Sequence, residues 1–321
     1  MNDNILVVLA FNESLNIENT IIDLYEDFDK IIVINDCSKD NTKTLVENLK
    51  TEYPNIDLIN NLTNQGAGKS LQIAFDYIKN EYSESSFIVK IDGDGQFLKK
   101  DILKIKDTLI KNDVDLVKSN RFWDEGIVGE IPLIRYLGNS IASLLIKMNT
   151  GLLQINDPLN GLFGFNKNFL HKINIPNLFK KYGYPFYINS IGVIEKVNII
   201  EINNTVRYDT GAKSQLNAFK MFVKLIIFLF IHFFKNISSK LKDSNLQVSA
   251  ILDIFYLLLQ IISYLSVYKL LYIRYISFDG IQSNWLLLFA ILQIFSYLVF
   301  YYSKKLENYY RKRFLKITNN S

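Results

Sequence analysis

The fold is decided by the stretch Phe87–Gln96, which reads FIVKIDGDGQ. Its first residues are mostly apolar and predict a buried strand, and the glycines mark the turn that ends it. Asp92 and Asp94 stand on this turn with one residue between them. Two such carboxylates can share one Mg²⁺ or Mn²⁺ ion, because these cations prefer oxygen ligands and are held by one or two carboxylates plus substrate phosphates. Taken alone, the stretch is equally typical of a solvated Asp-Gly turn.

Apolar runs of strand length alternate with helical periodicity around this stretch. Strands are predicted over 5–10, 31–34, 56–59, 115–119 and 197–202, and helices over 15–25, 42–50, 69–79 and 131–148. The alternation predicts an α/β fold with right-handed crossovers and a mostly parallel sheet flanked by helices. Ligands bind beyond the carboxyl ends of strands in such sheets. Three predicted strands end in polar groups suited to that position, namely Glu13, then Asp36, then Asp92 with Asp94.

The composition changes along the chain. The 321 residues are enough for about two domains, and 49% of them are hydrophobic. Residues 1 to 212 mix apolar runs with polar residues, whereas the chain after 217 is strongly apolar and aromatic. A net charge of +4 gives no case for nucleic acid binding. The single cysteine, Cys37, excludes an intrachain disulfide and fits a reducing compartment.

The C-terminal third predicts a membrane anchor. Residues 250–268 and 285–302 are each long and apolar enough for a membrane span. Residues 219–234 are shorter and carry two lysines on one helical face, which predicts an amphipathic helix in the membrane interface. The start of the chain lacks the pattern of a signal peptide. Lysines and arginines flank the two spans on one side, so the catalytic part and the C-terminal tail are predicted to be cytoplasmic.

These patterns predict four parts. They are a catalytic domain over 1–215, an interfacial helix with a basic linker over 216–247, a transmembrane hairpin over 248–303, and a basic tail over 304–321.

Short motifs follow one another in a characteristic order. They are LAFNE at 9–13, VINDCSKDNT at 33–42, NQGAG at 64–68, DGDGQ at 92–96, SNRF at 119–122, DPLNG at 157–161, Arg207, and GAKS at 211–214. With this ordered set the chain resembles family-2 glycosyltransferases of the Rossmann-like GT-A fold. It specifically resembles the membrane-anchored polyprenyl-phosphate glycosyltransferases related to dolichyl-phosphate mannose synthase. Asn35 and Cys37 depart from the Asp and Gly usual in the second motif, and Asn120 from the usual Gly or Ser.

The resemblance implies a donor site at the strand ends. Glu13 and Asp36 would contact the base and ribose of a nucleotide, and Asp92 would lie near the ribose and diphosphate. Asp94 would bind Mg²⁺ or Mn²⁺, with Asp92 as the second candidate metal ligand. Gln96 would lie close to the donor or the acceptor.

The resemblance also implies an acceptor site. Arg121, Arg135 and Arg207, with Lys213, would surround an acceptor phosphate, and Asp157 would lie on the sugar and acceptor side. The implied catalytic residues are Asp94, Asp157, Arg121 and Arg207.

The expected reaction is the inverting transfer of a sugar from a nucleotide-diphosphate sugar to undecaprenyl or dolichyl phosphate at the cytoplasmic membrane face, as in cell-wall and glycan biosynthesis. A phosphate monoester has a second pKa of about 6 and needs little help from a general base. One alternative is a hydroxyl acceptor on a glycan or a lipid-linked oligosaccharide, with Asp157 as the base. Another is a catalytically silent membrane partner protein. The sequence leaves the sugar, the nucleotide and the oligomeric state open, and the hairpin can serve homo-oligomer assembly.

Overall fold

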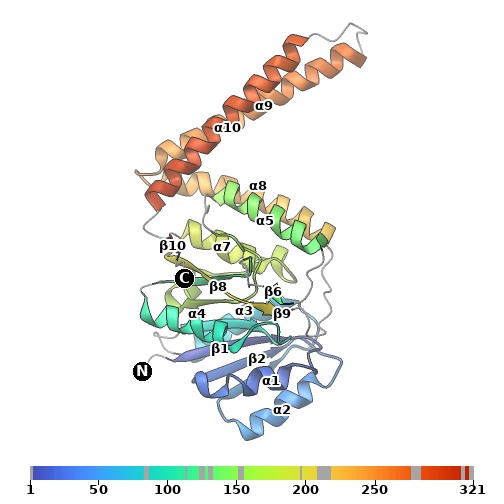
Figure 1. Cartoon of the computed structure of the whole chain (residues 1–321), viewed down its shortest axis with the longest axis vertical. Coiled ribbons are helices and arrows are strands. Elements are labelled where there is room, and N and C mark those ends of the chain that lie inside the picture. Colours follow the sequence, from blue (N-terminus) through green and yellow to red (C-terminus); the bar gives the residue numbers. More distant parts are fainter. Residues whose placement is uncertain are drawn as a thin grey trace. The chain divides into compact units, whose positions relative to one another are not determined.

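The computed structural model describes residues 3–82, 87–112, 114–122, 127–128, 133–150, 155–195, 197–207, 218–275, 283–311 and 315–317 (Figure 1). The chain divides into two compact units. Unit 1 comprises residues 1–147, 152–229 and 313–321, and unit 2 comprises residues 148–151 and 230–312.

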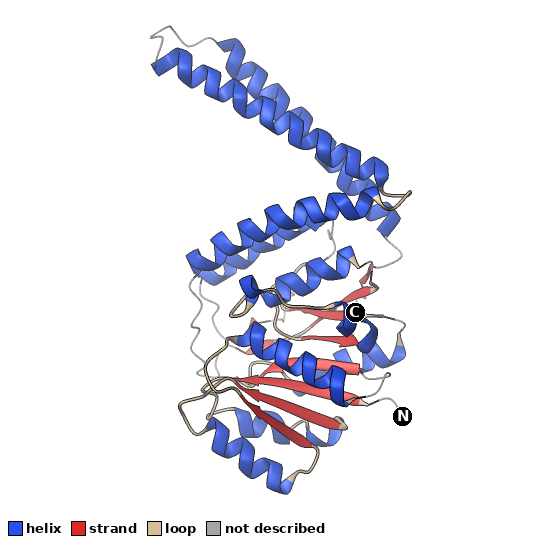
Figure 2. Ribbon diagram, turned by 180° about the vertical axis from the view of Figure 1, so that it is seen from behind, coloured by secondary structure: helices blue, strands red, loops and turns tan. Residues whose placement is uncertain are grey.

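Unit 1 is built on one sheet of eight strands in the order β10-β8-β5-β7-β4-β1-β2-β3. These strands are β1 (Asn4–Ala10), β2 (Lys30–Asn35), β3 (Ile56–Asn60), β4 (Phe87–Asp92), β5 (Leu116–Asn120), β7 (Phe163–Asn166), β8 (Ile199–Asn203) and β10 (Leu315–Ile317). Only β7 runs antiparallel to its neighbours β4 and β5. The predicted mostly parallel sheet is therefore confirmed, and helices lie on both of its faces (Figure 2).

Alternate residues of β1 enter two separate hydrophobic cores. Ile5, Val7 and Leu9 pack with α3 (Ala67–Glu81), α6 (Lys167–Lys172) and α7 (Tyr184–Ile194). Leu6 and Val8 pack on the other face with α1 (Ile17–Ile22), α2 (Thr42–Glu52) and α4 (Lys99–Lys111). A strand that is buried on both faces has a continuous apolar sequence. These strands could therefore be predicted from their apolar runs.

Several elements were not predicted from the sequence. They are β7, β10, α4, α6, and the short pair β6 (Ile127–Val128) and β9 (Val206–Arg207). The predicted helix over 15–25 is shorter, since α1 ends at Ile22 and a 3₁₀ turn covers Tyr25–Asp27. Residues 182–185 were predicted as a loop, but α7 already begins at Tyr184 after the turn at Gly183, whose φ is +86°. Pro185 is tolerated there because the first helical turn needs no intrahelical donor.

Helix α8 (Ala218–Leu241) is longer than the predicted interfacial helix over 219–234, and it begins in unit 1 and ends in unit 2. In unit 1 its Phe228 ring lies 4.9 Å from Phe179 and 5.6 Å from Phe186. Val223 and Ile226, on another side of the same helix, are exposed. Helix α5 (Leu133–Thr150) likewise exposes an apolar stripe, formed by Tyr136, Leu137, Ile141 and Leu144.

Unit 2 contains two long antiparallel helices, α9 (Gln247–Tyr275) and α10 (Ser283–Arg311). Gln247–Lys269 and Trp285–Glu307 each have 23 residues and a mean hydropathy of 1.9, enough by length and composition to cross a membrane. Both helices extend beyond the predicted spans, so residues 304–311 continue α10. Residues 315–317 of the predicted tail instead pair with β8. The alternation of Leu315 and Ile317 in this basic segment is too short to predict a strand.

Candidate functional site

The site begins where three neighbouring strands end. Leu9 of β1 pairs with Asp92 of β4, and Ala10 pairs with Asn35 of β2, so the segments after these strands meet at one edge of the sheet. The turns there are sharp, since Asn12 and Cys37 both have a φ of 60°. Non-glycine residues rarely adopt this conformation, and such positions concentrate at functional sites.

Three carboxylates lie near one another at this edge. Burial, together with the negative charges of Asp94 and Asp92, raises the pKa of Glu13 to about 8. Burial and the charge of Asp92 together raise the pKa of Asp94 to about 7. The backbone N–H of Gln96 donates to Asp94 Oδ1 at 3.1 Å. This grouping of acids is unfavourable by itself and is relieved when a cation binds, because a bound divalent ion becomes the dominant local charge.

The donor atoms fit a hard divalent cation. Asp92 and Asp94 offer carboxylate oxygens, and among the described residues no group of three or more His, Cys, Asp or Glu side chains forms a complete metal cage. Mg²⁺ and Mn²⁺ commonly take one or two carboxylates and complete their coordination with substrate phosphates and water.

Asp36 lies directly after β2, at the predicted edge of the sheet, and its carboxylate accepts hydrogen bonds from the 61–66 segment of the chain. Its Oδ1 accepts from Asn61 Nδ2 at 2.7 Å and from the Gln65 N–H at 2.8 Å, and its Oδ2 accepts from the Gly66 N–H at 2.7 Å. Gly66 has a φ of +87°, and a side chain at Gly68 would meet a backbone oxygen at 2.0 Å. Asp36 therefore shapes the 61–68 loop at the edge of the site.

Arg121 and Asp157 form a buried ion pair on the other side of β4. Arg121 Nε lies 2.8 Å from Asp157 Oδ2, and Arg121 Nη2 donates to Oδ1 at 3.2 Å. The backbone N–H groups of Asn156 and Asp157 donate to Glu201 at 2.8 and 3.1 Å. Asp157 is fully buried, so this geometry makes it an anchor for Arg121 rather than an accessible base.

Arg207 lies next to the acidic turn through its backbone. Its N–H donates to the carbonyl oxygen of Gln96 at 2.9 Å, and its side chain is exposed. The side chain of Arg135, on α5, and the whole of Lys213 lie outside the described residues. The structure thus brings the backbone of Arg207 to the acidic turn and places Arg121 in an ion pair.

Two buried lysines were not identified from the sequence. Lys90 donates to Asp92 Oδ1 at 2.6 Å, and Lys118 donates to the Asn160 carbonyl at 2.8 Å. Both are fully buried, and burial lowers the pKa of Lys118 to about 7. Each lysine interrupts an apolar strand run, in FIVKID and LVKSN. That interruption was the signal available in the sequence, because a lysine is almost never fully buried without a partner.

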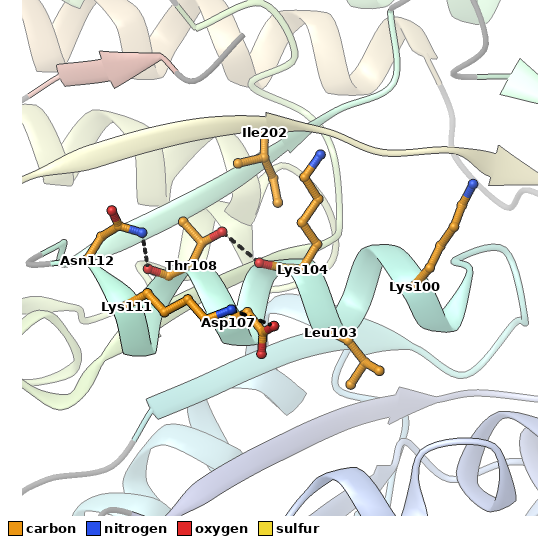
Figure 3. Close-up of a pocket in the computed structure, with 8 residues that line it drawn as sticks. All are labelled: Lys100, Leu103, Lys104, Asp107, Thr108, Lys111, Asn112 and Ile202. Atoms are coloured by element: carbon orange, nitrogen blue, oxygen red, sulfur yellow. Dashed lines mark hydrogen bonds and ion pairs between the residues drawn. The ribbon is translucent and has the colours of Figure 1, made fainter. Parts of the chain in front are cut away.

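A separate shallow pocket runs along α4 (Figure 3). It is lined by Lys100, Leu103, Lys104, Asp107, Thr108, Lys111, Asn112 and Ile202. Lys111 pairs with Asp107 at 3.3 Å within this helix face. The pocket contains none of the predicted site residues, so the candidate site rests on the strand ends.

Comparison with known proteins identifies the family of the N-terminal part of the chain. The profile of glycosyl transferase family 2 matches residues 5–173. A UDP-N-acetylglucosamine–dolichyl-phosphate N-acetylglucosaminyltransferase of Methanococcus voltae is 26% identical over 240 residues, which cover 69% of this chain and 94% of that protein. A dolichyl-phosphate β-glucosyltransferase of Trichomonas vaginalis is 34% identical over 101 residues, covering 28% of this chain and 30% of that protein.

A solved structure shares the fold. The structure of glucosyl-3-phosphoglycerate synthase from Mycobacterium tuberculosis aligns with a TM-score of 0.52 at 16% identity, over 76% of this chain and 82% of that one. The predicted GT-A architecture is thereby confirmed. The family profile covers more than half of the chain and includes the acidic turn and the 157–161 motif, so the chain belongs to glycosyl transferase family 2.

Proposed function

We propose that this glycosyltransferase moves a sugar from a nucleotide-diphosphate sugar to a polyprenyl phosphate at the cytoplasmic face of a membrane, with inversion at the anomeric carbon. The observation that carries the proposal is that the backbone of a cationic residue, Arg207, is bound to the acidic turn. The acidic turn ends at Gln96, whose carbonyl oxygen accepts from the N–H of Arg207. A site that joins acids to cations in this way suits a metal-bound diphosphate on one side and an anionic acceptor on the other.

The donor half consists of Glu13, Asp92 and Asp94. Asp94, with Asp92 beside it, would hold Mg²⁺ or Mn²⁺, and Glu13 would face the nucleotide. The bound ion supplies charge neutralisation for the diphosphate leaving group. The raised pKa values of Glu13 and Asp94 support this assignment, because perturbed acids concentrate at functional sites.

The acceptor half consists of cations. Arg121 and Arg207, with Arg135 and Lys213, would bind the acceptor phosphate, since guanidinium groups bind phosphate through two parallel hydrogen bonds. A phosphate monoester with a second pKa of about 6 is largely ionised at neutral pH and can attack without a general base. The buried ion pair of Asp157 supports this choice over a hydroxyl acceptor, which would need a free base in its place.

The apolar surfaces support a lipid acceptor. Unit 2 offers two helices long enough to cross a membrane, and α5 and α8 each expose apolar side chains. Exposed apolar patches mark membrane or partner contacts. Both relatives described above are named for a dolichyl-phosphate acceptor.

The test uses membranes that contain the full chain. Radiolabelled UDP-sugars and GDP-sugars are supplied with undecaprenyl or dolichyl phosphate, with Mn²⁺, with Mg²⁺, or with EDTA. The expected product is a labelled glycolipid whose formation requires the metal and the lipid phosphate. Label found only on a hydroxyl-bearing glycan, or on no lipid with any donor, contradicts the proposal.

A further inference from the structure

The ammonium group of Lys90 has a complete set of partners beneath the acidic turn. It donates to Asp92 Oδ1 at 2.6 Å, to the Gly161 carbonyl at 3.2 Å and to the Tyr184 hydroxyl. An ammonium has three donors, so each is used. These partners come from three parts of the site: the end of β4, the 157–161 motif and the start of α7.

Gly161 also lies close to the ion pair of Lys90 and Asp92. A side chain there would bring its Cβ within 2.7 Å of Asp92 Oδ2 and 3.5 Å of Lys90 Nζ. A heavy atom cannot occupy that position unless Asp92 moves. Gly161 therefore lets the backbone of the acceptor-side loop pack directly on the donor-side carboxylate.

The strand register fixes this arrangement. Lys90 of β4 and Lys118 of β5 both pair with Phe163 of β7, the strand that follows Gly161. Their ammonium groups lie 5.9 and 4.6 Å from the centre of the Phe163 ring. Lys118 reaches the Asn160 carbonyl, whereas Lys90 reaches the adjacent Gly161 carbonyl and Asp92.

We propose that Lys90 is a positioning residue that couples the donor half of the site to the acceptor half. Its ammonium group binds Oδ1 of Asp92 and the Gly161 carbonyl together, and so fixes Asp92 to the backbone of the 157–161 loop. This inference rests on the proposed function, because it assigns Asp92 to the metal and diphosphate. Residues that orient metal-binding carboxylates commonly matter by about 10- to 100-fold in metal affinity or activity.

The coupling is tested by a double-mutant cycle in the full chain in detergent. Binding of Mn²⁺ with UDP or GDP, whichever the unaltered protein binds, is measured by calorimetry for Lys90→Met, Asp92→Asn and the double variant. Lys90→Met is expected to weaken nucleotide binding about tenfold or more. In the Asp92→Asn background the same change is expected to cost less than about threefold, because its partner charge is already gone.

Gly161→Ala serves as the second variant, since it keeps Lys90 and displaces Asp92 through the Cβ. It is expected to weaken nucleotide binding to a similar extent as Lys90→Met. Lys167→Met is the matched control: Lys167 is also buried and donates to the backbone carbonyl of Tyr82, away from the site. This control is expected to lower the melting temperature but to leave nucleotide binding within about twofold.

The outcomes separate the two proposals. If the unaltered protein binds neither nucleotide, the donor half of the proposed function is overturned, and the role of Lys90 falls with it. If the unaltered protein binds a nucleotide and Lys90→Met binds it equally well, only the inference about Lys90 is overturned. Equal losses in the Asp92 and Asp92→Asn backgrounds would also overturn it, because they would show a purely structural lysine.

Discussion

Each unit of the molecule contains a cluster of charged side chains, buried in unit 2 and partly exposed in unit 1. In unit 2, Lys240 and Lys304 meet Asp253 and Glu307, two cations with two acids. Lys240 lies 2.6 Å from Asp253, and Ser303 donates to the second oxygen of Asp253 at 2.5 Å. All four charged residues are at most 3% exposed. This cluster is balanced and closed.

The cluster in unit 1 is unbalanced. Glu13, Asp92 and Asp94 repel one another, and Lys90 pairs with one oxygen of Asp92. The pKa values of Glu13 and Asp94 rise to about 8 and about 7. In a balanced buried cluster each charge depends on its partners and loss of one is destabilising, whereas an unbalanced cluster holds unfavourable charge that a cation can relieve. The difference predicts a structural role for the cluster in unit 2 and agrees with the chemical role proposed for the cluster in unit 1.

The largest expected effect breaks the chemistry without breaking the fold. Asp94→Asn should reduce glycolipid formation about 1,000-fold or more, an effect of about 4 kcal/mol on the barrier, because it removes the proposed metal ligand. The melting temperature should hold or rise, since a charge that burial and Asp92 disfavour is gone. Transfer assays and thermal unfolding check both statements, with the exposed surface acid Asp107→Asn as the control. A large fall in melting temperature would make this cluster structural, like the one in unit 2.

The next largest effect is expected in unit 2, where a substitution should lower stability and leave the transfer rate unchanged. Lys240→Met leaves two buried acids with Lys304 as their remaining lysine, and should lower the free energy of unfolding by about 3 kcal/mol. Thermal unfolding of the full chain in detergent measures the loss. Folded protein below its melting temperature should keep its transfer rate, and Lys242→Met, at an exposed lysine, should change neither property. A reduced transfer rate in folded Lys240→Met would remove the contrast between the clusters.

The sequence predicted the unbalanced cluster better than the balanced one. Glu13, Asp92 and Asp94 follow apolar strand runs, and the rule that parallel strands end at one edge was sufficient to bring them together. In the sequence, Lys240 and Lys304 are two of the lysines that flank the predicted spans, and Asp253 is a single acid within the first span. Their pairing depends on how α8, α9 and α10 pack, which local periodicity does not contain.

The same limit explains Lys90 and Lys118. Their partners include the carbonyl oxygens of Gly161 and Asn160, about 40 to 70 residues away in the chain. Those carbonyls come into reach only because β7 inserts antiparallel between β4 and β5. A strand of four residues carries too little pattern to be predicted, so its neighbours' buried lysines could not be assigned either.

A smaller effect concerns Lys118. This buried lysine donates to a carbonyl oxygen, whereas Lys240 donates to a carboxylate. Burial lowers the pKa of Lys118 from 10.5 to about 7. Between these values the unfolded chain binds a proton that the folded chain does not, so stability should rise with pH from about 7 toward 10.5. We expect a gain of about 2 kcal/mol between pH 7 and 9. Melting temperatures of the parent protein and Lys118→Met should show this slope in the parent alone; parallel slopes would contradict it.

The smallest expected effect concerns the polar contacts between α9 and α10, and it tests whether they contribute as little to stability as such contacts do in a membrane. Gln260 and Gln293 donate to each other's side-chain oxygens at 3.3 and 3.2 Å, and Gln260 also donates to Ser296 at 2.7 Å. In a membrane such bonds contribute about 0.6 kcal/mol each on average, because the separated helices also find polar partners. Gln260→Leu should therefore lower stability in detergent by about 1 kcal/mol or less, and Ile261→Leu, on the exposed face, should have no effect. If Gln260→Leu lowers stability as much as Lys240→Met does, the polar contacts along the whole hairpin stabilise unit 2. The stabilisation would then not be concentrated in the cluster of Lys240, Asp253, Lys304 and Glu307.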